Sequence, residues 1–114
     1  MRRVVVVLML VNAALFMLGA MQHAGVAIGP FREPQILPAT IVEALCALAL
    51  VWGALANTRW AALTGNLAAI TGVAIGMTAL ALARGPRTAS NDIYHVIMML
   101  LAAAALGCGG AASS

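Results

Sequence analysis

Three ionisable side chains lie inside stretches of sequence that are otherwise apolar. They are His23, Glu43 and His95. Imidazole changes charge near neutral pH, and a carboxylate inside an apolar segment is rare unless it faces other polar groups. The three side chains could therefore pair with one another, move protons or bind a cation. Tyr94 and Asp92 stand close to His95 in the sequence and complete a candidate polar layer.

Four roles are open for this layer. Glu43 can pair with a histidine or an arginine and simply hold the helices together. It can instead relay protons or bind a substrate cation together with the histidines. In the third role His23 and His95 ligate a metal or a haem, although no single segment has a paired-histidine spacing. The fourth role is a quinone or lipid pocket. The sequence requires none of these cofactors.

The composition indicates what kind of protein must position these residues. Of the 114 residues, 64% are hydrophobic and 8% are charged, and the mean hydropathy is +1.05. Soluble domains carry about 25% charged residues, so this chain cannot cover a water-facing surface. In a membrane protein, a net charge of +3 affects the orientation of the chain in the bilayer and its contacts with lipid headgroups. The composition argues against a disordered protein, a secreted disulfide scaffold and a nucleic-acid binder, and it indicates the lipid bilayer as a partner.

Four apolar stretches are long enough to cross the hydrocarbon core, which takes about 20 helical residues. They cover residues 4–28, 39–56, 60–83 and 93–107, and residues 108–114 form a short tail. Short polar or proline-rich breaks separate them. This pattern predicts one all-α transmembrane domain over the whole chain. We expect an antiparallel four-helix bundle in the cell (inner) membrane, with both termini on the same side.

Residues that begin and end helices mark the breaks between these stretches. Pro38 suits the first turn of the second stretch, and Gly85 suits the end of the third. Ser90, Asn91 and Asp92 are the predicted N-cap residues of the fourth stretch. With a rise of ~1.5 Å per residue, these boundaries place all three ionisable side chains within ~10 Å of one membrane face.

Arginines lie at both ends of the predicted bundle. Those on the side of the termini are Arg2, Arg3 and Arg59. The loop arginines, which would surround the polar layer, are Arg32, Arg84 and Arg87. Because the two ends have equal numbers of arginines, the positive-inside rule does not decide the orientation of the chain in the membrane. The charged amino terminus before the first helix favours both termini in the cytoplasm.

Small residues recur every three or four positions along the third stretch. Gly65, Gly72 and Gly76 are the candidates for helix packing, and the last two form a GxxxG pattern. Such a stripe lets two helix backbones approach closely in lipid. The expected partner is the alanine-rich part of the fourth stretch, residues 102–105, and dimerisation is the alternative.

Two segments of the chain carry a family resemblance. Residues 41–50 read IVEALCALAL, and residues 59–63 read RWAAL. This part of the chain resembles the second-to-third helix region of DoxX-like four-helix membrane proteins. In that family a Glu opens helix two, and a short basic turn leads into an alanine-rich third helix. The resemblance implies a small bacterial membrane subunit, in some members linked to quinone-coupled redox complexes, and it puts Glu43 forward as the position to test.

These features predict a small non-enzymatic integral membrane protein. We expect a subunit, or an accessory or assembly factor, of a larger bacterial membrane complex, because the chain is poor in catalytic groups and rich in packing stripes. Its partners would be other membrane subunits or a second copy of itself. The alternative function is a proton-coupled small transporter or ion path that uses Glu43 with His23 and His95. The third is a redox protein that binds haem, a metal or quinone.

Overall fold

The computed structural model describes residues 2–26, 35–56, 58–85 and 88–112, with side chains described as far as Cys108. The described residues form four helices and no strand: α1 (Arg2–His23), α2 (Leu37–Leu55), α3 (Arg59–Leu82) and α4 (Ala89–Ala112). The prediction of an all-α chain with four helices is confirmed for these residues.

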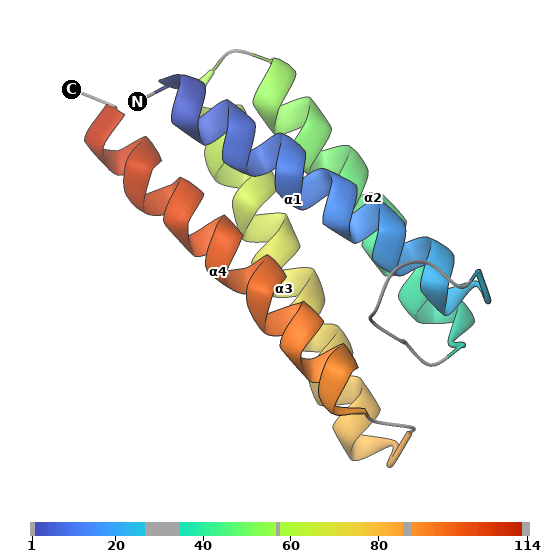
Figure 1. Cartoon of the computed structure of the whole chain (residues 1–114). Coiled ribbons are helices and arrows are strands. Elements are labelled where there is room, and N and C mark those ends of the chain that lie inside the picture. Colours follow the sequence, from blue (N-terminus) through green and yellow to red (C-terminus); the bar gives the residue numbers. More distant parts are fainter. Residues whose placement is uncertain (1, 27–34, 57, 86–87, 113–114) are drawn as a thin grey trace.

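Consecutive helices run antiparallel to each other (Figure 1). Each helix packs against the next, and α4 packs against α1, so that the four helices close into a ring around one core. Both ends of the chain lie at the same end of the bundle, which we call the terminal end (Figure 1). The opposite end, where α1 joins α2 and α3 joins α4, is the loop end. The molecule measures 44 × 26 × 20 Å.

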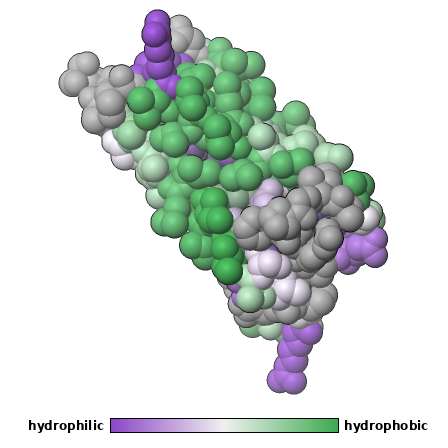
Figure 2. All heavy atoms as spheres, in the orientation of Figure 1, coloured by the Kyte–Doolittle hydropathy of each residue, from purple (hydrophilic) through white to green (hydrophobic). Residues whose placement is uncertain are grey.

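The outer surface of the bundle is apolar along its length. Large apolar side chains are exposed on every helix, for example Val7, Leu45, Ile75 and Leu100. Hydrophobic atoms cover the middle of the face shown in Figure 2, and hydrophilic atoms project at its two ends. All four helices are long and apolar enough to cross a membrane.

The core is a narrow apolar column inside the ring of helices. Its largest fully buried apolar side chains are Met9, Phe16, Leu50 and Met98. They come from α1, α2 and α4, whereas α3 contributes small residues such as Ala69. When apolar side chains also cover the outside, close van der Waals contact has to hold the helices together.

The first helix ends earlier than the predicted Ile28, at His23. Gly25 adopts a φ of 108°, and the backbone N–H groups of Gly25 and Val26 donate to the carbonyls of Gln22 and Met21. This pattern is a Schellman motif, in which a residue of left-handed conformation stops the helix and satisfies its last carbonyls. His23 is therefore the last residue of α1, and residues 27–34 lie outside the described part of the chain.

The fourth helix is longer at both ends than the predicted 93–107. Its N-cap is Thr88, whose hydroxyl accepts a hydrogen bond from the backbone N–H of Asn91 at 3.1 Å. The prediction that Ser90, Asn91 or Asp92 caps the helix is therefore wrong, because the threonine before them already performs that role. The helix also continues to Ala112, so the predicted tail is helical as far as that residue.

The ends of α2 and α3 largely follow the predicted signals. Pro38 lies in the first turn of α2, as expected, and Thr58 caps α3 by accepting from the backbone N–H of Ala61 at 3.1 Å. At the other end of α3, the prediction that Gly85 is the residue that caps the helix is wrong. Arg84 takes the left-handed conformation there, with a φ of 52°, and Gly85 follows it and donates to the carbonyl of Leu80.

Two of the candidate packing glycines of α3, Gly65 and Gly72, face α2 rather than the predicted partner, α4. A Cβ atom added at Gly65 would lie 2.7 Å from the carbonyl oxygen of Ala49, and one added at Gly72 would lie 2.6 Å from Cys46 Sγ. A Cβ at Gly76 would meet no atom within 4 Å. The stripe is thus divided along the helix, because its first part packs against α2 and no described residue packs against Gly76. In the view of Figure 1 the α3–α4 pair diverges from the α1–α2 pair towards the loop end.

Candidate functional site

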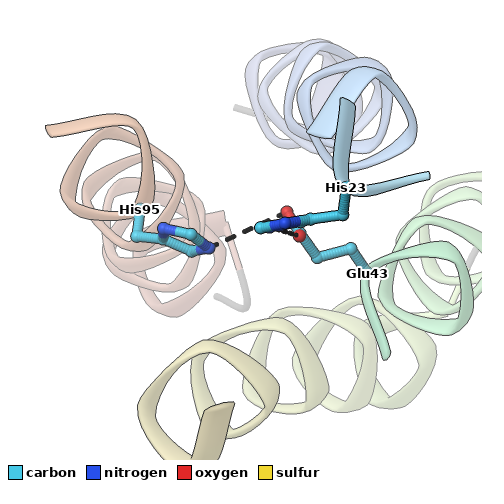
Figure 3. A group of neighbouring side chains, drawn as sticks. All are labelled: His23, Glu43 and His95. Carbon is cyan, nitrogen blue, oxygen red and sulfur yellow. Dashed lines mark ion pairs between the residues drawn. The ribbon is translucent and has the colours of Figure 1, made fainter. Parts of the chain in front are cut away.

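The structure brings His23, Glu43 and His95 together in the interior of the bundle near its loop end. The three side chains come from α1, α2 and α4 and point towards one another (Figure 3). His23 Nε2 lies 2.7 Å from Glu43 Oε2, and His95 Nε2 lies 3.9 Å from Glu43 Oε1. The two imidazole ring centres are 6.1 Å apart. We call these three residues the His–Glu–His cluster.

Helix ends hold the first two members of the cluster in place. His23 closes α1, and its carbonyl accepts a hydrogen bond of 3.1 Å from the backbone N–H of Ile36, just before α2 begins. This bond ties the end of α1 to the start of α2. Glu43 lies in the second turn of α2, about 9 Å from its first residue. Its carboxylate therefore reaches back to the level of His23.

The third member is oriented by its own helix. His95 Nδ1 lies 2.7 Å from the carbonyl oxygen of Asn91, one turn earlier in α4. A carbonyl oxygen only accepts, so Nδ1 carries the proton and donates it. In the neutral imidazole the lone pair is then on Nε2, the atom that faces Glu43.

All three side chains are excluded from solvent. The exposed fractions of His23, Glu43 and His95 are 3%, 4% and 8%. A buried carboxylate is stable only when nearby groups compensate its charge, because the apolar interior replaces the water that would solvate it. The polar group nearest to the carboxylate is His23 Nε2, 2.7 Å from Glu43 Oε2.

An apolar layer lies between the cluster and the terminal end. Phe16 lies two turns from His23 on α1, Leu50 two turns from Glu43 on α2, and Met98 about one turn from His95 on α4. These three apolar side chains are almost completely buried. The cluster is therefore much closer to the loop end than to the terminal end, and this layer separates it from the latter.

Tyr94 and Asp92, the other predicted members of the layer, lie outside the cluster. Tyr94 is buried, and its hydroxyl donates to the backbone carbonyl of Leu15 on α1. Asp92 is partly buried in the first turn of α4, where a negative charge is favourable to the helix dipole. Tyr94 directly precedes His95 in the sequence, but one residue corresponds to about 100° around the helix axis, so its side chain points to α1 instead.

The loop arginines add little to the described site. Arg84 is exposed at the end of α3. Arg32 and Arg87, which we expected around the polar layer, lie outside the described residues.

Asn91, predicted as an N-cap residue, contributes to the site instead. Its carbonyl orients His95, and its side chain is 1% exposed. The spacing of four residues between Asn91 and His95 is the signal that could have identified it, since residues at this spacing lie on one face of a helix. We predicted it as an N-cap instead, because the start of α4 was placed too late.

The arrangement of donor atoms limits the chemistry of the cluster. Two imidazole nitrogens and one carboxylate can share a proton, or they can coordinate a cation. Cys46 is buried near Glu43 on α2, but its thiol lies 3.7 Å from the carbonyl of Ala68 on α3 and so faces away from the cluster. The donor set is therefore nitrogen and oxygen without sulfur.

Comparisons with protein-family models, with curated proteins and with solved structures find no match for this chain. Its function is therefore inferred from its own geometry.

Proposed function

We propose that this chain is a multi-pass protein of a bacterial inner membrane and serves as a non-enzymatic subunit or accessory factor of a larger membrane complex. The observation that carries the proposal is an exposed surface of small residues on the second half of α3. The resemblance to DoxX-like proteins supports the same function and suggests a complex of redox character.

A membrane location is supported by the size of the molecule and by its surface. A hydrocarbon core is about 30 Å thick, and a bilayer with its headgroups is about 40–45 Å thick. The bundle is 44 Å long and exposes apolar side chains over its middle. Arg2, Arg3 and Arg59 at the terminal end and Arg84 at the loop end suit the two headgroup regions.

A partner helix is supported by the small-residue surface. Gly76, Ala79 and Ala83 lie on one face of α3 and its end and are all exposed. A Cβ atom at Gly76 would meet none of the described residues within 4 Å, and α3 is the least buried of the four helices. In lipid, small residues allow a second helix to approach closely, which is how transmembrane helices associate without a hydrophobic driving force between them. The proposed occupant is a helix of another membrane protein.

The alternative of an ion path through a single bundle receives less support. Phe16, Leu50 and Met98 lie between the His–Glu–His cluster and the terminal end, and all three side chains are apolar and buried. An ion or a hydrated proton crossing the bundle would have to displace this layer.

The experiment is capture of the tagged chain from native membranes in mild detergent, followed by mass spectrometry. We expect a stoichiometric membrane partner with the wild-type chain. Gly76→Leu should lose it, because the larger side chain occupies the docking face without meeting any atom of its own bundle. Gly107→Leu is the matched control, since a side chain there also meets nothing within 4 Å, but on α4. Recovery of the wild-type chain alone, or equal capture by both variants, would contradict the proposal.

A further inference from the structure

The His–Glu–His cluster has a second property, which does not depend on a partner protein. His23, Glu43 and His95 each offer one ligand atom, and these atoms all lie within 4.8 Å of one another. We propose that they form a binding site for one divalent first-row transition-metal ion that accepts nitrogen and oxygen donors, the class to which Zn²⁺ belongs.

The distances in the cluster suit such an ion. Zn²⁺ binds histidine nitrogen and carboxylate oxygen at about 2.0–2.2 Å, so tetrahedral ligand atoms lie about 3.3–3.6 Å apart. His23 Nε2 lies 2.7 Å from Oε2 of Glu43, and His95 Nε2 lies 3.9 Å from the other oxygen, Oε1, so the two contacts lie on either side of this value. Small rotations of the three side chains would bring their ligand atoms to one centre without a change in the helices.

The surroundings of His95 match those of a metal ligand. A histidine that binds a metal through one ring nitrogen almost always donates the other N–H to a carboxylate, a backbone carbonyl or water. His95 does so, from Nδ1 to the carbonyl of Asn91, and this leaves Nε2 for the ion. His95 is therefore already oriented as a metal-binding histidine would be.

Charge also favours a divalent ion at this position. With neutral imidazoles the cluster carries the single negative charge of Glu43, in a site where all three residues are at least nine-tenths buried. A divalent ion reverses that charge to a single positive one and replaces weak contacts by coordinate bonds. The mixed donor set distinguishes among metals, because Mg²⁺ and Ca²⁺ prefer oxygen ligands alone, and Cu⁺ prefers sulfur.

The number of protein ligands predicts what kind of metal site this is. Closed structural zinc sites have four protein ligands, whereas sites that act on a further molecule have three and keep a position open. Two histidines and one glutamate are three protein ligands, so a water molecule or another ligand would complete the coordination of the ion. The ion would also join α1 and α2 to α4 near the loop end, where the two helix pairs diverge (Figures 1 and 3).

The test uses the full-length chain in detergent, purified through a tag that contains no histidine. Titration with Zn²⁺ should show one saturable site per chain. Glu43→Gln and His95→Ala should each weaken binding by more than about 100-fold, since loss of an outer partner of a ligand alone costs about 10- to 100-fold. Cys108→Ser is the control, because it removes a free thiol that lies outside the cluster, and it should bind as the wild type does.

Two further measurements separate loss of binding from loss of folding. Zn²⁺ should raise the unfolding temperature of the wild-type chain and of Cys108→Ser, with an effect that grows with concentration, but not that of Glu43→Gln. X-ray absorption of the Zn²⁺-loaded chain should show nitrogen and oxygen neighbours and no sulfur. The proposal is overturned if the folded wild type shows no saturable binding, if both ligand variants bind normally, or if sulfur is a ligand. The first result would leave a cluster that only pairs its own side chains, and it would not affect the capture of a partner.

Discussion

At the scale of single residues, two reciprocal hydrogen bonds close the ring of helices. Asn12 on α1 donates from Nδ2 to the backbone carbonyl of Met98 on α4, at 3.0 Å. In the opposite direction, the hydroxyl of Tyr94 on α4 donates to the carbonyl of Leu15 on α1. Both bonds join the first helix to the last, far apart in the sequence, and both lie in surroundings where a lost partner is not replaced by water.

Removing the Tyr94 hydroxyl should therefore destabilise the bundle. We expect Tyr94→Phe to lower the free energy of unfolding by about 0.5–1.5 kcal/mol, the range for one intramolecular hydrogen bond. Denaturant unfolding in detergent would measure it. Thr78→Val is the matched control, because that exposed hydroxyl bonds only to Ala74 of its own helix, at 2.8 Å. Equal stability of Tyr94→Phe and Thr78→Val would show that the bond between helices contributes nothing measurable.

At the scale of the helices, the pairing of α2 with α3 depends on glycines that face inward. Gly65 and Gly72 bring α3 close to Ala49 and Cys46 of α2. Gly53 of α2 likewise allows α3 to approach, since a Cβ atom there would lie 2.6 Å from the carbonyl oxygen of Ala61. Gly76 lies on the same helix but in open space. One helix thus offers both a buried and an exposed glycine for comparison.

Gly65→Ala and Gly76→Ala should have opposite effects on stability. At Gly65 the new methyl group would meet a backbone oxygen at 2.7 Å, so the helices must separate, and overpacking of this kind costs about 1–3 kcal/mol. At Gly76 the methyl group meets nothing, and alanine favours the helix by up to about 1 kcal/mol. Unfolding of the purified single chain measures both. A loss of stability in Gly76→Ala as large as that in Gly65→Ala would contradict the difference in packing between these two glycines.

At the scale of the whole molecule, the bundle places the two ends of the described chain together, and Arg84 lies at the opposite end (Figure 1). If the helices cross a membrane, the chain ends must share one compartment and the α3–α4 loop must lie in the other. The arginines divide equally between the two ends, with Arg2, Arg3 and Arg59 at the terminal end. The charged amino terminus before the first helix is therefore the reason to expect the terminal end in the cytoplasm.

Reporter fusions test this topology. A fluorescent protein that folds only in the cytoplasm should be active at the C-terminus and inactive when inserted between α3 and α4. A phosphatase that is active only outside the cytoplasm should give the opposite pattern. Activity of one reporter at both positions would mean that the antiparallel bundle does not span the membrane.

Much of the architecture follows from local features of the sequence. Each apolar stretch is a continuous run, and an isolated backbone in an apolar medium satisfies its polar groups by forming a helix. The four helices and the helix-starting position of Pro38 could therefore be predicted without knowledge of any contact. The shared depth of His23, Glu43 and His95 could also be predicted, because helical rise is the same for every residue.

Rotation of each helix about its axis was decided only by the tertiary structure. That rotation directs His95 towards Glu43 and its neighbour Tyr94 towards Leu15. Gly65 and Gly76 lie on nearly the same side of α3, about three turns apart, and only the packing of α3 against α2 decides that Gly65 is in contact while Gly76 is not. The exact helix ends were also not predictable, because more than one neighbouring residue could end a helix. At the end of α3, for example, Arg84 rather than Gly85 takes the left-handed conformation. Hydropathy is a property of each segment alone and predicts the helices. Rotation and contact are properties of all four helices packed together, so the sequence by itself predicted which residues could form the cluster but not which of them meet.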